Sequence, residues 1–448
     1  MMTDTITAAP ETGIFSRDQV EILSARKGEP GWLLDARMRA HGAFADTPMP
    51  TTRLEDWRYT DIKKALKLDA FSFAEERGPG SAGGFAAGLT ALMDEAGESA
   101  ARLVQVDASV VLREVPEELA AQGVIFTSLE IAVQQHPELV QRFLGTGLSP
   151  EDGKFAAMNE SLWTGGAFLY VPRDVQVEAP FRVYRWIGEG GTAAFGRTLV
   201  VAEQGARIAV VETLGSDDFA RQALSVGAAE IFADEGATAI YTSVQRYGRG
   251  VIHLSTDRLM AGRDARITTL YTTFGADLSR ADVQCRLRAP GSHVDMLGLY
   301  IADGTQHFDN QTLQDHLAPH ASSNLLFKGA LNDAGRSVFR GLIRVHPKAQ
   351  RTDAYQTNRN LILSDKARAD SLPNLEIQAD DVRCSHAATV GQLDEEEVFY
   401  LLSRGIPKAE AVRLVVFGFF GEVLEQLPLE GVKQELLRVV ERKLDASR

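Results

Sequence analysis

A cysteine and a histidine stand two residues apart near the C-terminus, in the triplet Cys384-Ser385-His386. On a β-strand, side chains alternate between the two faces, so residues i and i+2 point the same way. We therefore expect Cys384 and His386 to lie side by side, with their Cα atoms roughly 7 Å apart. A thiolate beside an imidazole suits iron, zinc or a sulfur-bearing intermediate.

Two ligands do not complete a tetrahedral metal site, which needs four. If a metal binds at Cys384 and His386, further ligands must come from elsewhere, for example from a partner chain. The alternative is structural, because a cysteine on a strand is often a small apolar filler and a histidine a surface group. The spacing alone leaves both interpretations open.

A second group of potential metal ligands lies upstream, at His307, Asp309, Asp315, His316 and His320. Their spacing matches no compact metal motif such as His-Glu-x-x-His. His316 and His320 share a face only on a helix, and Pro319 disfavours a helix there. We interpret these side chains as structural or interface groups first, with a metal site as the alternative.

Other catalytic signals are weak. Cys285 lies in an alternating segment, residues 283–287, that is typical of a strand, so we expect a buried structural thiol. No Ser-His-Asp arrangement or nucleophile elbow stands out. The sequence has no Walker A motif, so we expect this chain to bind no nucleotide and not to hydrolyse ATP itself.

The composition is that of a soluble globular protein. The chain has 448 residues, 44% hydrophobic and 24% charged, which leaves room for two or three domains. A net charge of −14 argues against a nucleic-acid partner, and two cysteines favour a reducing compartment. Neither a signal peptide nor an apolar stretch of about 18 residues is visible, so we expect a cytoplasmic protein with no membrane span.

The N-terminal part, residues 1–150, reads as a helical or mixed domain. Residues 14–68 carry helical signals, including a candidate capping box at Ser16-Arg17-Asp18-Gln19. The glycine-rich stretch 78–84 lacks the Lys-Ser/Thr ending of a phosphate-binding loop, so we interpret it as a flexible linker.

Short alternating apolar runs replace the helical pattern from about residue 165. Equivalent-looking strands start at Gly205, Gly236, Asp264 and Ser292, which are 31, 28 and 28 residues apart by subtraction. Regular short strands are typical of a sandwich, a barrel or a β-solenoid, and a persistent repeat favours the solenoid. We therefore predict a mainly β fold, with a right-handed parallel β-helix core over residues 151–393 and helical regions at both ends.

After Asp394 the pattern becomes helical again, which defines a C-terminal helical domain over residues 394–448. Gly405 fits the end of one helix and Pro407 the start of the next. The second helix is apolar on more than one face. Its side chains either pack within a helical cap or partly dock a second protein.

Several segments resemble the SufB/SufD family of iron–sulfur cluster assembly proteins. They are residues 373–377, 380–391 and 399–406, together with Glu55-x-Trp57-Arg58-Tyr59-Thr60 and residues 352–358. The Cys-Ser-His form is similar to SufD proteins, whereas SufB proteins usually carry a His-Glu pair there. Ala387 departs from the family pattern, which commonly has glycine at that position.

The resemblance implies a SufD-like scaffold subunit that pairs with a SufB-like subunit through the β-helix, or with a second copy when isolated. Cys384 and His386 would face that interface and help hold iron or a nascent cluster, transiently shared with the partner. The resemblance also implies that a SufC-like ABC ATPase binds the C-terminal helices. The residues expected to bind partners are Phe399, Arg404, Val412, Val416, Phe419 and Phe420.

Two other functions stay open at this stage. Parallel β-helices commonly carry carbohydrate-active enzymes with acidic residues in an external groove. The chain could also be a purely structural adaptor subunit that holds its partners together without binding iron.

Overall fold

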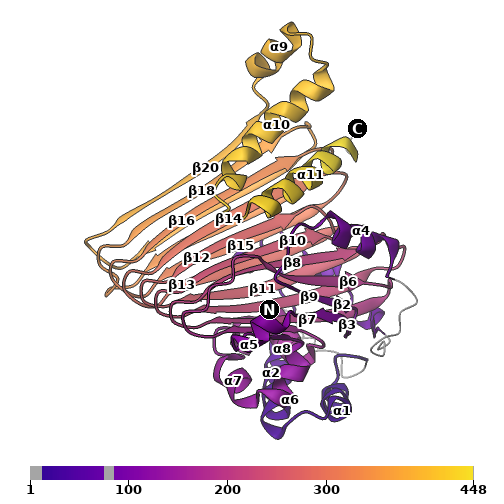
Figure 1. Ribbon diagram of the computed structural model, residues 1–448. Helices are drawn as coiled ribbons and strands as arrows, with labels where there is room; N and C mark the ends of the chain where they lie inside the picture. Colours follow the sequence, from indigo (N-terminus) through magenta and orange to yellow (C-terminus); the bar gives the residue numbers. More distant parts are fainter. Residues whose placement is uncertain (1–12, 75–84, 447–448) are drawn as a thin grey trace, which may run out of the picture.

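The computed structural model describes residues 13–74 and 85–446 (Figure 1). The predicted linker 78–84 lies outside these residues. Figure 1 shows a coil of strands, with helices near both ends of the chain lying against its sheets. The mainly β fold with helical ends is therefore confirmed, whereas the right-handed winding of the coil stays a prediction.

The N-terminal part is a set of short helices. The first helix starts as predicted, because the Ser16 side chain accepts the N–H of Gln19. The helix ends at Gly28, which has a φ of 61°. The helices are α1 (Arg17–Lys27), α2 (Gly31–Asp46), η1 (Glu55–Trp57), α3 (Ile62–Ala65), η2 (Leu68–Ala70), α4 (Ala87–Glu95), α5 (Glu117–Ala121), α6 (Leu129–Gln135), α7 (Pro137–Phe143), η3 (Pro150–Asp152) and α8 (Lys154–Leu162).

Two sheets form the solenoid. We call sheet A the set β1 (Ser72–Phe73), β4 (Ile125–Thr127), β5 (Ala167–Val171), β7 (Thr192–Ala202), β9 (Ala223–Ala233), β11 (Val251–Ala261), β13 (Leu278–Leu287), β15 (His307–His316), β17 (Arg336–Val345) and β19 (Arg368–Ile377). Sheet B comprises β2 (Ala101–Val106), β3 (Ser109–Glu114), β6 (Phe181–Ile187), β8 (Arg207–Ser216), β10 (Thr238–Arg246), β12 (Arg266–Thr273), β14 (His293–Ala302), β16 (Ser322–Leu331), β18 (Asp353–Ile362) and β20 (Arg383–Gln392).

The chain alternates between the two sheets from β5 to β20, and every neighbouring pair in that run is parallel. The predicted repeat is one full coil. Ile208, Ala239, Ile267 and Val294 follow the four predicted starts and are register partners on β8, β10, β12 and β14. Each repeat of about 30 residues thus contains two strands, of which the sequence pattern identified the one in sheet B.

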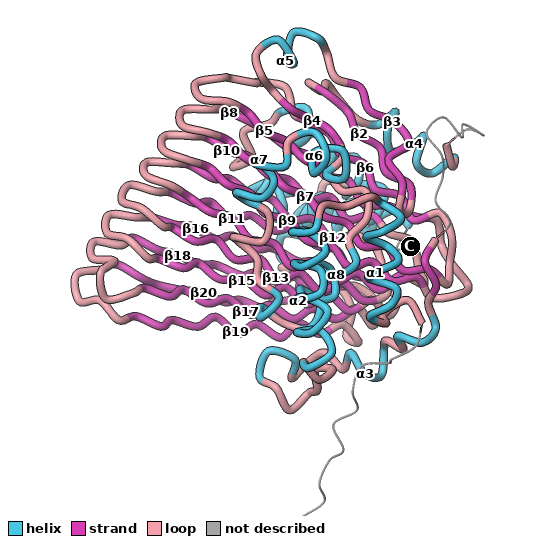
Figure 2. The backbone as a smooth tube through the Cα atoms, turned by 90° about the horizontal axis from the view of Figure 1, so that it is seen from below, coloured by secondary structure: helices cyan, strands magenta, loops and turns pink. Residues whose placement is uncertain are grey.

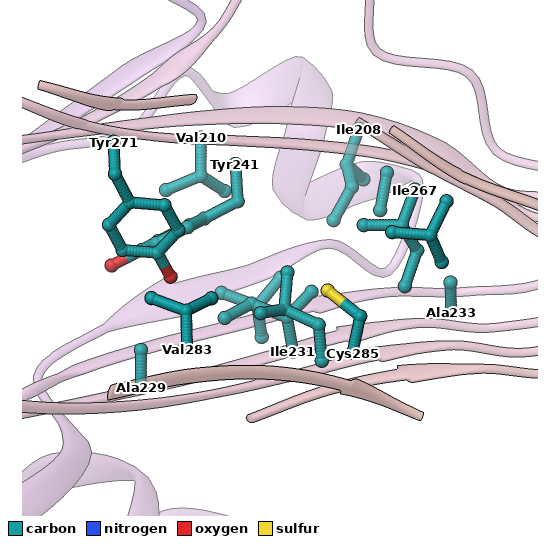
Figure 3. Close-up of a cluster of buried hydrophobic side chains, with 14 of the residues drawn as sticks. Ile208, Val210, Ala229, Ile231, Ala233, Tyr241, Ile267, Tyr271, Val283 and Cys285 are labelled. Atoms are coloured by element: carbon teal, nitrogen blue, oxygen red, sulfur yellow. The ribbon is translucent and has the colours of Figure 1, made fainter. Parts of the chain in front are cut away.

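The core fills the space between the sheets (Figure 3). Ile208, Val210 and Tyr271 of sheet B face Ile231 and Cys285 of sheet A, and all of them are buried. Cys285 is fully buried, as predicted, and burial raises the pKa of its thiol far above the ordinary value. A thiol that stays protonated in an apolar core is a poor nucleophile.

Several N-terminal helices lie over the outer face of sheet A, whereas α4 packs on β8 of sheet B. Helix α8 packs on β7, β9 and β11, and α2 packs on α8 (Figure 2). The regular coil begins at Ala167, so η3 and α8 precede it although they fall within the predicted 151–393 core. Strands β2, β3 and β4 of the N-terminal part extend the two sheets, and these strands cover the first coil.

The C-terminal helices lie over the outer face of sheet B. They are α9 (Glu395–Ser403), α10 (Lys408–Leu424) and α11 (Glu430–Ala446). Gly405 adopts φ 82° after α9, and Pro407 precedes the first residue of α10, as the sequence predicted. Over residues 13–74 and 85–446, no helix has the length and apolar character needed to cross a membrane.

Candidate functional site

The last coil leaves the solenoid open at its C-terminal end. Strand β19 is the end of sheet A and β20 the end of sheet B, and each is paired on one side within the described chain. The outer edges of two ten-residue strands therefore present backbone donors and acceptors. Exposed edges of this length are templates for pairing with another chain.

Cys384 and His386 lie on this last strand and face the same way. Cys384 is the register partner of Ala354, and His386 is the register partner of Gln356. Ala354 and Gln356 are both buried inside the solenoid. Because neighbouring parallel strands present register partners on the same face, Cys384 and His386 point into the open mouth of the coil. The predicted side-by-side placement is confirmed.

The two side chains differ in exposure. His386 is exposed, whereas Cys384 is half-buried and packs against a small apolar group that includes Ile343 and Ala354. Burial and the nearby Asp353 carboxylate raise the pKa of the Cys384 thiol. The thiol is therefore protonated near neutral pH, and it must release a proton when it binds a metal.

Cys384 and His386 alone are too few to complete a metal centre. No group of three or more His, Cys, Asp or Glu side chains that could hold a metal ion occurs in the part of the chain that the structure describes. Cys384 and His386 thus supply two ligand atoms where a tetrahedral centre needs four. If a metal binds at Cys384 and His386, its other ligands have to come from outside the described residues.

The mouth of the coil also carries apolar side chains that the sequence analysis did not single out. Leu375 and Ile377 on β19 and Val390 on β20 are exposed. Their register partners Ile343, Val345 and Asn360 are buried inside the coil, so the three side chains continue the core beyond the last paired strand. An apolar face with free strand edges on both sides is typical of a protein–protein contact.

The second predicted ligand group is not a single site. His316 lies inside the coil and hydrogen-bonds Ser323 at 2.8 Å, and burial lowers its pKa to about 4. Asp315 points to the other side of the same strand and contacts His346 at 3.0 Å. His320 lies in a turn at φ 58°. The structural interpretation of these residues fits the structure better than a shared metal site.

His307 and Asp309 bind the N-terminal segment instead. The Thr60 hydroxyl donates to the Asp309 carboxylate at 2.6 Å and contacts the His307 ring at 2.9 Å. Arg280 pairs with Asp309 and lies over the Trp57 ring at 3.9 Å. The segment that resembles the family signature near residue 57 is therefore a strap across the outer face of sheet A.

A Ser-His-Asp chain exists that the sequence did not reveal. His293 contacts Ser322 through Nδ1 at 2.7 Å and Asp295 through Nε2 at 2.9 Å on the outer face of sheet B. The strand register brings β14 and β16 together, which residue spacing does not show. The surrounding backbone pairs in the parallel ladder, which leaves no pair of N–H groups there to stabilise an oxyanion. This chain of hydrogen bonds therefore joins neighbouring strands.

An outer groove of about 640 Å³ crosses sheet A. Its carboxylates are paired: Asp282 with Arg258 at 3.2 Å, and Glu376 with Arg344 at 3.0 Å. The described residues that line it include no aromatic side chain on which a sugar ring could stack. The groove thus lacks the free acids of a glycosidase.

The predicted partner-binding residues of the C-terminal region fall into three groups by exposure. Val416 and Phe420 are 0% exposed and pack against sheet B, so their side chains belong to the core rather than to a free surface. Phe399 is 70% exposed, and Arg404 lies over the ring of the exposed Tyr400. Val412 and Phe419 are half-buried.

Grooves flank α9 on both sides. One of about 960 Å³ is lined by residues that include Tyr400, Leu414 and Gly418, and one of about 510 Å³ by residues that include Phe399 and Val412. Within the described chain, α9 makes its main helix contact with α10, and it projects from the solenoid in Figure 1. The first turn of α9 is acidic, with Glu395, Glu396 and Glu397.

Comparisons with known proteins cover nearly the whole chain. The family model described as "SUF system FeS cluster assembly, SufBD core domain" matches residues 185–419, and "SufBD protein N-terminal region" matches residues 19–183. The iron-sulfur cluster assembly protein SufD of Bacillus subtilis is 32% identical over 96% of this chain and 98% of its own length. SufB of the same organism is 28% identical over 97% and 94%.

A third relative also matches almost the whole chain. The iron-sulfur cluster assembly SufBD family protein of Staphylococcus epidermidis is 28% identical over 98% of this chain and 94% of its own length. The matches therefore include the helical segments as well as the solenoid. This chain belongs to the SufBD family of iron–sulfur cluster assembly proteins.

Proposed function

We propose that this chain is a SufD-like, non-catalytic subunit of a cytoplasmic iron–sulfur cluster assembly scaffold. Its open solenoid end pairs with a SufB-like subunit, and its C-terminal helices dock a SufC-like ATPase. The observation that carries the proposal is the half ligand set of Cys384 and His386 at an unpaired, apolar solenoid end. Such a site is completed by a second chain.

The choice of SufD over SufB rests on the ligand residues. Identities of 32% to a SufD and 28% to a SufB are too close to separate the two. The Cys384-Ser385-His386 triplet resembles the SufD form, since SufB proteins usually carry a His-Glu pair there.

The iron and sulfide of the nascent cluster are the cargo of this site. Thiolate and imidazole bind iron well, and the partner adds the remaining ligands. Because the thiol is protonated near neutral pH, loading releases a proton and improves as pH rises through the thiol pKa. In this proposal, closing of two ATPase subunits pulls on α9 and α10 and opens the seam around Cys384.

Replacement of the ligands tests the proposal. The complex is co-expressed with its SufB-like and SufC-like partners and purified without oxygen, and its iron and sulfide are measured. We expect Cys384→Ser with His386→Ala to lower both contents severalfold, because thiolate and imidazole are lost. ATPase binding should be unchanged, since α9 and α10 are intact.

Ser385→Ala is the matched control, because Ser385 lies between the two ligands and points to the opposite face of β20. It should load like the wild type. Equal iron and sulfide in the ligand double variant would remove the cluster-binding role and leave the adaptor function. Failure of the wild-type chain to co-purify with either partner would contradict the scaffold function itself.

A further inference from the structure

A buried lysine lies under α10. Lys328 is on the outer face of β16 and is 3% exposed, within an apolar interface between sheet B and α10. Its neighbours on the same face of the strand, Leu326 and Ala330, are buried and apolar. A lysine is seldom found at such a position unless its ammonium group is paired.

The ammonium group is held by α10. Lys328 Nζ donates to the Phe419 carbonyl at 2.7 Å and pairs with the Glu422 carboxylate at 2.5 Å. Glu422 also contacts Arg359 at 3.3 Å. The hydrogen bond from Lys328 is the first cause of the lowered pKa of Glu422. One carboxylate of α10 thus contacts cations on two neighbouring strands.

The contact between Lys328 and Glu422 sets the position of α10 more than it stabilises the fold. Only the lysine of the pair is buried, since the Glu422 side chain is 48% exposed. Burial of the ammonium group costs desolvation energy that offsets much of the attraction, so an apolar side chain of similar size can often replace such a group without loss of stability. Methionine would fit the apolar surroundings of Lys328. The Lys328 ammonium group instead fixes the position of α10 along β16. The Phe419 carbonyl and the Glu422 carboxylate can both reach it only when this turn of the helix lies over the strand.

The same strands lead to the open end. Lys328 and Arg359 are register partners, and the next residue in this row is Thr389 on β20. Strand β18 pairs with β20 along all ten positions, which include Cys384 and His386. Glu422 contacts Arg359 on β18, and β18 pairs with β20. A movement of Glu422 therefore displaces the strand next to the one that carries Cys384 and His386.

The backbone of α10 can bend near the contact with Lys328. Gly418 and Gly421 flank the pair Phe419-Phe420. Apart from the adjacent residues and the local backbone of α10, no described atom lies within 4 Å of a Cβ added at either glycine. Packing within the chain therefore does not require these glycines. Glycine inside a helix weakens it and eases local bending.

We propose that Lys328, with Glu422 and Arg359, is the positioning contact that transmits movement of α9 and α10 to Cys384 and His386. This inference rests on the proposed function, because a partner docked on α9 supplies the movement. Lys328 touches neither iron nor nucleotide, and it acts through the position of β18 and β20.

Alkylation of Cys384 measures this coupling. Cys285 is fully buried, so iodoacetamide labelling of the native complex, followed by peptide mass spectrometry, reports Cys384. We expect nucleotide binding to change the Cys384 labelling rate in the wild-type complex by at least about fivefold. Lys328→Met and Glu422→Gln should reduce this response below about twofold.

The control is Glu441→Gln, which removes the negative charge from the 2.5 Å ion pair of Arg413 and Glu441 that joins α10 to α11. It should keep the wild-type response. Gel filtration and thermal melting confirm that each variant assembles and folds. A full response in both Lys328→Met and Glu422→Gln overturns the coupling, and so does an assembled wild-type complex without any response. Failure of the wild-type chains to assemble contradicts the proposed function instead.

Discussion

At the scale of single residues, the Cys384 thiol is held in its protonated form by its surroundings. Burial is the first cause of its raised pKa and the Asp353 carboxylate the second. A thiolate is repelled by a neighbouring carboxylate, so removal of that charge should stabilise the thiolate. The reactivity of the site is therefore adjustable through a residue that is not a ligand.

We predict that Asp353→Asn lowers the pKa of Cys384. At pH 8 only a small fraction of the thiol is ionised, so the rate of alkylation by iodoacetamide should rise about two- to threefold. The rate should increase with pH in both proteins, and the variant curve should lie at lower pH. Asp365→Asn, in a loop that follows β18, is the control with an unchanged profile. Identical profiles for Asp353→Asn and wild type would exclude the carboxylate effect.

The predictability of the site residues follows from their distance in sequence. The common face of Cys384 and His386 was predictable because alternation on one strand is a local property. The contacts of His307 and Asp309 with Thr60 were not, because they join residues almost 250 positions apart. The same holds for Ser322 and His293, which only the strand register brings together.

At the scale of elements, the sequence identified α10 as an apolar helix. It did not show which face of α10 is buried against the solenoid. Helical periodicity shows that a stripe exists and not what covers it. Val416 and Phe420 proved to be core, whereas Phe399 on α9 is free of the core. The repeat in the sequence did not include the strands of sheet A. The reason is related: β9, for example, is buried almost throughout, so apolar and polar side chains do not alternate along it.

This division predicts opposite effects for two phenylalanines. Phe420→Ala should lower the free energy of unfolding by about 3–5 kcal/mol, because it leaves a cavity between α10 and sheet B. Phe399→Ala should change stability by less than about 0.5 kcal/mol and weaken binding of the ATPase partner. Urea unfolding and pull-down of the folded variants measure the two effects. Undiminished ATPase binding by Phe399→Ala would remove α9 from the proposed dock.

At the scale of the whole molecule, the apolar mouth of the last coil is the surface through which we expect the SufB-like subunit to bind. An inward charge at a free strand edge prevents pairing in many sheet proteins. Ile377 points into the mouth and is 41% exposed, so a long charged side chain fits there in the isolated subunit.

We predict that Ile377→Lys weakens pairing with the SufB-like subunit at least about tenfold. The melting temperature of the isolated chain should stay close to the wild-type value, because the side chain reaches water. Ile22→Lys, at an exposed position on α1 away from the open end, is the control and should pair normally. Sedimentation of the mixed subunits gives both affinities, and normal pairing by Ile377→Lys would place the interface elsewhere.

The unlike ends of the solenoid limit how many molecules can join. At the first coil, sheet A finishes with β4, which has three residues. Sheet B finishes with β3, which pairs antiparallel with β2 in a register that shifts between Val104 and Gln105 of β2. Neither offers the straight, ten-residue parallel edge that the last coil presents. Copies therefore cannot stack head to tail into a fibre, which is the usual hazard of a bare β-sheet edge. With one open solenoid end in the part of the chain that the structure describes, pairing through the solenoid stops at two subunits, while the C-terminal helices stay available to another partner.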